Sequence, residues 1–323
     1  MGRLAYLHRV LHAYVLGGNS QLTFWHETPA VNDQVFTGEL TQYYMTFEHK
    51  AHYPGPFDDR GVPLLDYHGK VGRQYNPIAV SQYALGNYNL AQRTGEPCYR
   101  DRFLANAEWL LRHLDVTEHG TYLWPHHFDF EYFRPLIAPW YSGLAQGQGL
   151  SVLLRAYAVT GSEEYLDTAR HVFRSLTVGI RDGGVQHTDE DGHIWIEEYL
   201  VDPPTHILNG FIWALWGVHD YALLTGEPEA RTLFDGYTET IVSNLPRYDM
   251  GFWSLYELTP QRIKSIASPF YHQLHLVQLE VMYRLTGRET FADYGRRWRS
   301  YAQHAPLRMT AKAYKAAFKL LYY

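Results

Sequence analysis

A fourfold repeat constrains the fold of this chain more than any other feature of its sequence. Each repeat reads as an apolar helix, a Thr-Gly turn and an amphipathic helix. Glycine accepts the left-handed conformation that ends a helix, and an acid after the turn, as in GEP or GSEE, favours the next helix start. The turns lie about 60 to 70 residues apart, at Thr94-Gly95, Thr160-Gly161, Thr225-Gly226 and Thr286-Gly287.

The two helices of each repeat differ in where they expose polar residues. The first is apolar nearly all round, which predicts burial, whereas the second has a polar face, which predicts an outer position. Stacked hairpins with an inner and an outer layer predict a mainly α fold, an (α/α) toroid or barrel. A solenoid is the alternative, although its repeats are usually shorter and more regular. With 323 residues, 46% of them hydrophobic, the chain can build a large core.

The loops between the hairpins are long and rich in glycine and aromatic residues. Alternation in HIWIEEY and FWSLYEL predicts short β-hairpins at one mouth of the barrel. Residues 71–323 form the barrel domain in this interpretation. Residues 1–70 start with a helix-like stretch at 1–18, and scattered aromatics around PGPFDDRGVP follow. They predict an irregular arm, with a possible β-hairpin, that packs on the barrel.

Side chains just before the inner helices converge at the same mouth, because each loop precedes an inner helix. Tyrosine recurs there, at Tyr75, Tyr141, Tyr199 and Tyr271. Any one of these could simply pack in the core, since the chain holds 27 tyrosines. Four equivalent tyrosines beside polar residues such as Gln146, Gln148 and Asn209 favour a ligand cleft.

Composition excludes several classes of function. A net charge of −6 argues against nucleic-acid binding, and a single cysteine, Cys98, rules out a disulfide framework. No apolar run is long enough for stable membrane insertion. Histidine and arginine interrupt the apolar start of the chain, so it does not resemble a secretory signal, and a cytoplasmic location is favoured.

No cofactor or metal site is predicted. A Gly-rich phosphate loop, a GxSxG motif and an HExxH motif are all missing from the sequence. The 18 histidines include His126 and His127 near Asp129, and His272 and His275 at helical spacing. Both arrangements are weak metal signals, and we predict none.

Two kinds of chemistry fit a carbohydrate cleft in such a fold. Glycoside hydrolysis needs two carboxylates that flank the bond; Glu197 or Glu198 would be the acid, and no specific partner among Asp129, Glu131 and Glu257 stands out. Tyrosine chemistry is the other kind. A phenol has an ordinary pKa of about 10 and exchanges a proton when its surroundings allow. Such chemistry suits removal of a C–H proton beside a carboxyl group, as in uronan lyases and uronate epimerases.

The ordered series WIEEY, ILNGFIWALWGVHDY, LPRYDMGFWSLYEL, SPFYHQLHLVQL and RRWRSYAQ resembles the C-terminal domain of the D-glucuronyl C5-epimerases. Upstream, YNPIAVSQYALGNY and APWYSGLAQGQGLSVLLRAY extend the resemblance, which covers about Tyr75 to Gln303. It implies an α/α barrel and conversion of glucuronate to iduronate in heparosan and heparan-sulfate precursors. The chain has no room for the large β-rich insertion of the animal members and resembles a compact microbial form.

By position, the resemblance implies catalytic roles for Tyr199 with its neighbour Glu198, and for Tyr256 and Tyr271. It implies a substrate contact for Asn209. The predicted substrate-binding residues are Tyr75, Glu131, Tyr141, Gln146, Gln148, Asn209, Trp213, Arg262, Lys264 and His272.

The chain departs from the family pattern at two positions. The family's Arg-His after Tyr-Asp-Leu is here Thr259-Pro260, and Phe270 replaces an Asp before Tyr271. The lost Arg would hold an anionic group through paired hydrogen bonds. Arg262 or Lys264 in the same loop is the expected substitute.

The prediction is therefore a uronate C5-epimerase that acts on a heparosan-type polysaccharide and forms a homodimer. An α/α-toroid hydrolase or lyase of uronate polymers, or a non-catalytic uronan-binding protein, is the alternative. The mechanism expected is proton removal from C5 on one face, by Tyr199 with Glu198, and proton return from the other face, by Tyr256 with Tyr271.

Overall fold

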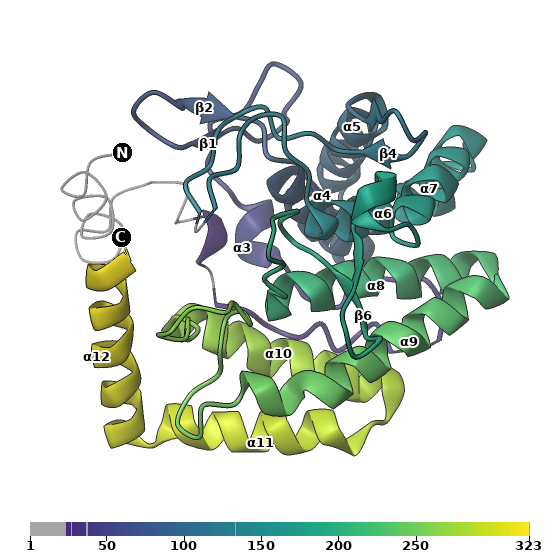
Figure 1. The fold of residues 1–323 in the computed structure, drawn as a ribbon. Helices are drawn as coiled ribbons and strands as arrows, with labels where there is room; N and C mark the ends of the chain where they lie inside the picture. The colour runs from purple at the N-terminus through teal and green to yellow at the C-terminus, as the bar shows by residue number, and fades with distance from the viewer. Residues whose placement is uncertain (1–23, 27, 37, 133, 323) are drawn as a thin grey trace.

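Helical hairpins in two layers make up most of the molecule (Figure 1). The structure, a computed structural model, describes residues 24–26, 28–36, 38–132 and 134–322. The helix-like stretch expected at 1–18 lies outside the described residues. The inner layer consists of α4 (Pro77–Thr94), α6 (Gly143–Thr160), α8 (Leu208–Thr225) and α10 (Pro269–Thr286). This arrangement confirms the predicted (α/α) toroid.

The Thr-Gly turns end the inner helices as predicted. Gly95, Gly161, Gly226 and Gly287 all adopt the left-handed conformation, with φ between 67° and 72°. In each turn the threonine hydroxyl donates to a carbonyl four residues earlier, as Thr94 does to Leu90 at 2.9 Å. The outer helices follow: α5 (Pro97–Arg112), α7 (Glu163–Ser175), α9 (Pro228–Asn244) and α11 (Glu289–Gln303).

Polar residues cap three of the four inner helices: α4, α6 and α10. The side chain of Asn76 accepts from the backbone of Ile78 at 2.9 Å, and Ser142 and Ser268 cap α6 and α10 in the same way. These caps fix where three of the four inner helices start; α8 follows Ile207, which makes no capping hydrogen bond through its side chain. The loops before the inner helices meet at one end of the barrel, the mouth.

The loops contain short antiparallel β-hairpins. They are β1 (Leu65–Asp66) with β2 (Arg73–Gln74), β3 (Asp115–Val116) with β4 (Tyr122–Leu123), and β5 (Gln186–Thr188) with β6 (Ile194–Ile196). The last confirms the strand expected in HIWIEEY. The FWSLYEL segment forms only isolated bridges, such as Leu255 with Ile266, after the 3-10 turn η2 (Leu245–Tyr248). Another 3-10 turn, η1 (Ile180–Asp182), precedes β5.

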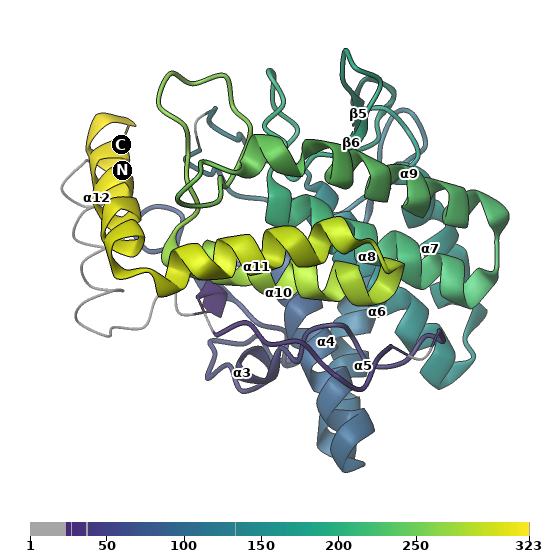
Figure 2. The same ribbon diagram turned by 90° about the horizontal axis from the view of Figure 1, so that it is seen from below.

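The part of the N-terminal arm around residues 41–51 packs on the barrel away from the mouth. It carries the short helix α3 (Glu48–Ala51), which lies against α4. A buried ion pair between Arg155 of α6 and Asp220 of α8, at 2.5 Å, also reaches this arm. Arg155 donates to the Thr41 carbonyl at 3.0 Å, and Tyr44 donates to Asp220 at 2.7 Å. Figure 2 shows the arm segment that contains α3 on the opposite side of the barrel from β5 and β6. The boundary predicted at residue 70 falls inside the β1–β2 hairpin.

The C-terminal helix α12 (Ala305–Tyr322) turns away from α11 and stands at the side of the barrel (Figures 1 and 2). Lys315 from this helix donates to the Ile266 carbonyl at 2.5 Å, which ties α12 to the loop before α10. Among the residues described, no helix is both long and apolar enough to cross a lipid bilayer.

Candidate functional site

An aromatic cavity opens at the mouth, where the inner helices begin. It encloses about 810 Å³ of space, part of it open to solvent. Its wall combines apolar rings with a few polar groups, which is typical of a small-molecule site. The lining residues are Trp25, His26, Tyr67, Asn76, Ile78, Gln82, Phe128, Phe130, Trp140, Leu144, Glu198, Tyr199, Asn209, Trp213 and Tyr271.

The two neighbouring carboxyls after β6 have different surroundings. Glu197 is fully buried and accepts hydrogen bonds from His206 Nδ1 at 2.5 Å and from the backbone of Thr205 and His206. Glu198 lines the cavity, is 5% exposed, and has no described partner for its Oε2 atom. Glu197 directly follows β6, and the chain bends at Glu198, so the two side chains go to different sides. Glu197 therefore holds the loop, and Glu198 is left for the cavity.

Gly210, at the start of α8, makes room for Glu198. A methyl group at Gly210 would overlap Oε2 of Glu198, so any other residue type would displace the carboxyl. The Leu-Asn-Gly-Phe sequence is thus needed for its glycine as well as for Asn209, which lines the cavity beside it.

Tyrosines cluster around this carboxyl. The Tyr199 ring lies 4.7 Å from the Tyr132 ring, and the Tyr256 ring lies 4.8 Å from the Tyr271 ring. The Tyr132 phenol donates a hydrogen bond to Glu257. Tyr199 and Tyr271 line the cavity directly, whereas Tyr256 packs edge-on against Tyr271 and is not a lining residue.

Burial sets the protonation states of these groups. It raises the pKa of the Glu198 carboxyl to about 8, with the nearby charges of Glu257 and Glu197 adding to the effect, against a hydrogen bond from Tyr199. Burial and then the charge of Glu198 raise the pKa of the Tyr199 and Tyr256 phenols well above their usual value. At neutral pH the phenols are proton donors, and Glu198 is the group that gains or loses a proton near that pH.

Several residues predicted to bind substrate lie elsewhere. Gln146 is a buried structural bridge that accepts from the Trp124 backbone at 3.0 Å and donates to the Tyr122 carbonyl at 2.8 Å. His272 stacks on Trp253, with ring centroids 3.8 Å apart, and bonds to the Trp298 carbonyl. Both side chains are fully used in holding helices together.

Two of the four equivalent tyrosines also lie outside the cavity. Tyr75 is 37% exposed and donates to Asp58 at 2.9 Å, and Tyr141 donates to Asp115 at 3.2 Å. The expectation that all four share one cleft is therefore wrong: Tyr75 packs against Trp109 of α5, and Tyr141 bonds to β3.

The expected substitutes for the missing Arg do not reach the cavity. Arg262 and Lys264 are exposed, and Lys264 donates to the Thr259 carbonyl at 3.3 Å. Glu131 is exposed as well. Within the described part of the chain, His26 is the one lining residue that can carry a positive charge. Its ring lies 4.9 Å from Phe270, the residue that replaces the family's Asp.

Sequence reasoning missed much of the cavity wall. Trp25, His26 and Tyr67 come from the arm, and Phe128, Phe130 and Trp140 come from the loop before α6. The aromatic run in GTYLWPHHFDFEYF was the available signal for the second group. Nothing local to the arm indicates that its aromatics reach the mouth.

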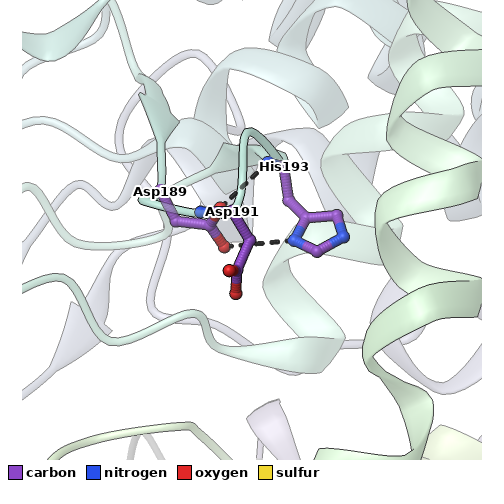
Figure 3. Close-up of side chains that lie close together, drawn as sticks. All are labelled: Asp189, Asp191 and His193. Atoms are coloured by element: carbon purple, nitrogen blue, oxygen red, sulfur yellow. Dashed lines mark hydrogen bonds and ion pairs between the residues drawn. The ribbon is translucent and has the colours of Figure 1, made fainter.

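The groups considered for a metal have other roles. The His126 ring stacks on the Trp140 ring with centroids 3.7 Å apart, and burial lowers the pKa of His126 to about 3. One cluster, Asp189, Asp191 and His193, holds possible ligand atoms within 4.8 Å of one another (Figure 3). It lies in the β5–β6 turn, where Asp189 accepts from the backbone of Asp191 and His193 and from Trp195 Nε1. Turn geometry explains the cluster, since Asp189 caps the turn.

Comparison with known proteins places the chain among carbohydrate-active proteins. The model of the family D-glucuronyl C5-epimerase C-terminus matches residues 118–300. An uncharacterized protein of Methanocaldococcus jannaschii is 31% identical over 268 residues, 76% of this chain and 85% of that protein. The D-glucuronyl C5-epimerase of Caenorhabditis elegans is 29% identical over 216 residues, which cover 62% of this chain but only 35% of that enzyme.

A solved structure matches the fold over nearly the whole chain. Cellobiose 2-epimerase from Bacillus thermoamylovorans superposes with a TM-score of 0.54 at 14% identity, covering 93% of this chain and 70% of that one. At this level of identity the match shows a shared α/α-toroid fold alone.

Proposed function

Because this chain belongs to the D-glucuronyl C5-epimerase family, we propose that it converts D-glucuronate to L-iduronate residues in a heparosan-type polysaccharide. Family membership supports its assignment as a carbohydrate epimerase. One observation carries the proposal: a buried carboxyl with a pKa of about 8, Glu198, shares the aromatic cavity at the mouth with the phenols of Tyr199 and Tyr271.

Glu198 is the base in this proposal. A base works best when its pKa lies near the working pH, and burial brings Glu198 to that range. Its ionised carboxylate takes the C5 proton, and the electron pair moves into an enediolate on the C6 carboxyl group. The Tyr199 phenol, which stays protonated, hydrogen-bonds to Glu198 and holds its orientation.

Tyr271 is the acid on the opposite face. Its phenol gives a proton to C5 from the side opposite Glu198, which inverts the centre. Tyr256, packed edge-on against the Tyr271 ring, supports that ring. Glu198 then releases its proton to solvent and the Tyr271 phenolate takes one from solvent, so the enzyme returns to its starting state with no net change in protons and C5 carries a hydrogen from solvent.

Neutral donors hold the substrate's C6 carboxylate in this site. The candidates are the Asn209 amide and the phenols, with His26 as the one described lining residue that can add positive charge. Hydrogen bonds to the carboxylate strengthen as charge develops on it during proton removal. This replaces the bidentate Arg of the family pattern.

Deuterium exchange tests the proposal directly. The protein is incubated with heparosan and other uronate polymers in D₂O, and products are analysed by NMR and chain-length measurement. We expect deuterium at C5, new iduronate residues and unchanged chain length. New reducing ends, an unsaturated product that absorbs in the ultraviolet, or binding of every polymer without C5 exchange would each overturn it.

Matched tyrosine variants test the assignment of roles. Tyr271→Phe should slow C5 exchange by about 10²–10⁴, the effect of losing an acid group. Tyr199→Phe should slow it less, because Glu198 loses only the hydrogen bond that orients it. Tyr75→Phe is the control, because its phenol bonds to Asp58 outside the cavity. Full exchange in both cavity variants would show that the phenols play no part.

A second candidate rests on another carboxyl. Glu257 is buried, its pKa is raised by burial, and its charge acts on Glu198. Two such carboxyls are what a glycoside hydrolase needs. Glu257, however, bonds to Tyr132 and does not line the cavity, which favours the epimerase. The chain-length measurement above separates the two.

The family resemblance also implies a homodimer, which belongs to the proposal. Light scattering of the purified protein tests it: the mass should be twice that of the 37.6 kDa chain. A monomeric mass at all concentrations would refute it.

A further inference from the structure

Buried oxygen atoms without partners gather around the cavity. Among the described residues, Gln82 Oε1, Asn209 Oδ1 and Glu198 Oε2 lack hydrogen-bond partners, and all three residues line the cavity. A buried polar atom left without a partner costs free energy, so natural proteins rarely keep one without use. Oxygens of this kind suit a ligand that brings hydrogen-bond donors, as the hydroxyls of a sugar do.

Gln82 is the member of this set that no motif identifies. It is fully buried on α4, and its Nε2 donates to Gln148 Oε1 of α6 at 3.0 Å. Gln82, Gln148 and Trp213 are each the sixth residue of their inner helices. They therefore lie at the same depth below the mouth, where Gln82 and Trp213 line the cavity.

The pairing of the two amides decides what Gln82 offers. Since its amide nitrogen is used by Gln148, its carbonyl oxygen is the atom left over. An apolar residue at both positions would fill the same space without leaving polar atoms unpaired. Keeping two glutamines deep in the barrel thus has a cost in stability, which a role in binding would explain.

We propose that Gln82 is a substrate-positioning residue, whose amide oxygen accepts a hydrogen bond from a hydroxyl of the bound sugar, and that Gln148 fixes the orientation of this amide. The inference rests on the proposed carbohydrate function and deepens it. Asn209, across the cavity on α8, gives a second hydroxyl acceptor, so the sugar is held from two inner helices while Glu198 meets C5.

The test separates binding from stability. Gln82→Met removes the acceptor at similar volume, and Gln82→Met with Gln148→Met also removes the amide that would otherwise lose its partner. We expect both variants to raise KM for heparosan oligosaccharides about three- to tenfold, the effect of one neutral hydrogen bond, with kcat within about twofold. Gln148→Met alone should raise KM less.

Thermal unfolding supplies the readout that a purely structural role would change. The single Gln82→Met variant should lower Tm, because Gln148 loses its partner, and the double variant should restore Tm to wild type or above. A double variant with restored Tm and wild-type KM would overturn the proposal. If KM only follows Tm across the series, the glutamines act as a core pair and nothing more.

A binding measurement keeps this test independent of catalysis. Calorimetry with a heparosan hexasaccharide in a Glu198→Gln background reports affinity without turnover, and Gln82→Met should weaken Kd three- to tenfold there too. Analogues that lack the C2 or the C3 hydroxyl of the uronate identify the hydroxyl that Gln82 contacts. The analogue without that hydroxyl should bind with the same Kd to the protein with Gln82 and to the Gln82→Met variant. Wild-type protein that binds but never exchanges C5–H refutes the proposed function and leaves this inference standing. Unchanged Kd in Gln82→Met refutes only the inference.

Discussion

Glu197 and Glu198 are adjacent in sequence and yet have separate surroundings. Glu197 accepts a 2.5 Å hydrogen bond from His206 and is sealed in the loop, whereas Glu198 faces the cavity with an oxygen that has no described partner. The Tyr248 phenol donates to the His206 carbonyl at 2.5 Å and reinforces the loop. One carboxyl is thus structural, and the other is free for chemistry.

The same substitution at the two positions should therefore have different effects. Glu198→Gln should slow C5 exchange by about 10²–10⁴ and leave Tm unchanged or higher, since it removes a buried acid. Glu197→Gln should lower the free energy of unfolding by about 1–3 kcal/mol, because it weakens charge-assisted hydrogen bonds to His206 and the loop backbone. Exchange kinetics and urea unfolding measure both. Equal loss of activity at equal Tm would contradict the division of roles.

Gly210→Ala should act on catalysis through Glu198. The added methyl group meets Oε2 of Glu198, so the carboxyl must move from its place. We expect kcat to fall at least tenfold, since small misplacements of a reacting group are costly. Gly295→Ala, on α11 with no atom within 4 Å of the new methyl, is the control and should be neutral or stabilising by up to about 1 kcal/mol. Wild-type kcat in Gly210→Ala would show that Glu198 is not held at this position.

Stability should depend on pH through Glu198 with a definite sign. Its carboxyl ionises near 4.5 when unfolded and at about 8 when folded, so the folded state binds the extra proton between these values. This contribution is fully present below about pH 4.5 and is lost as the pH rises through 8. The Tm of Glu198→Gln relative to wild type should therefore increase from pH 5 to pH 9. Glu118→Gln, at a surface carboxyl, should show no such trend.

The ion pair between Arg155 and Asp220 should be essential for attachment of the arm. Both side chains are buried, and Arg155 also holds the Thr41 carbonyl. Arg155→Met leaves a buried charge without its partner and should cost about 3–5 kcal/mol in urea unfolding. Adding Asp220→Asn removes that charge and should recover part of the loss. Full stability in the single variant would mean that the arm is held by other contacts.

Local chemistry in the sequence determined the architecture. Left-handed glycines after threonine and the contrast between apolar and amphipathic helices act within a few residues of one another, so they can be read without a structure. The same signals placed Tyr199, Asn209 and Tyr271 near one mouth, and the family resemblance named Glu198.

Only the tertiary structure decided which side chains share the cavity. The direction of a side chain in a loop depends on how that loop packs, so Tyr75 and Tyr141 turn away while Tyr199 and Tyr271 turn in. Trp25 enters from an arm distant in sequence, and Gln82 meets Gln148 only because two inner helices pack side by side. Burial, which gives Glu198 its raised pKa, is a property of the assembled barrel, because desolvation requires every wall of the cavity at once.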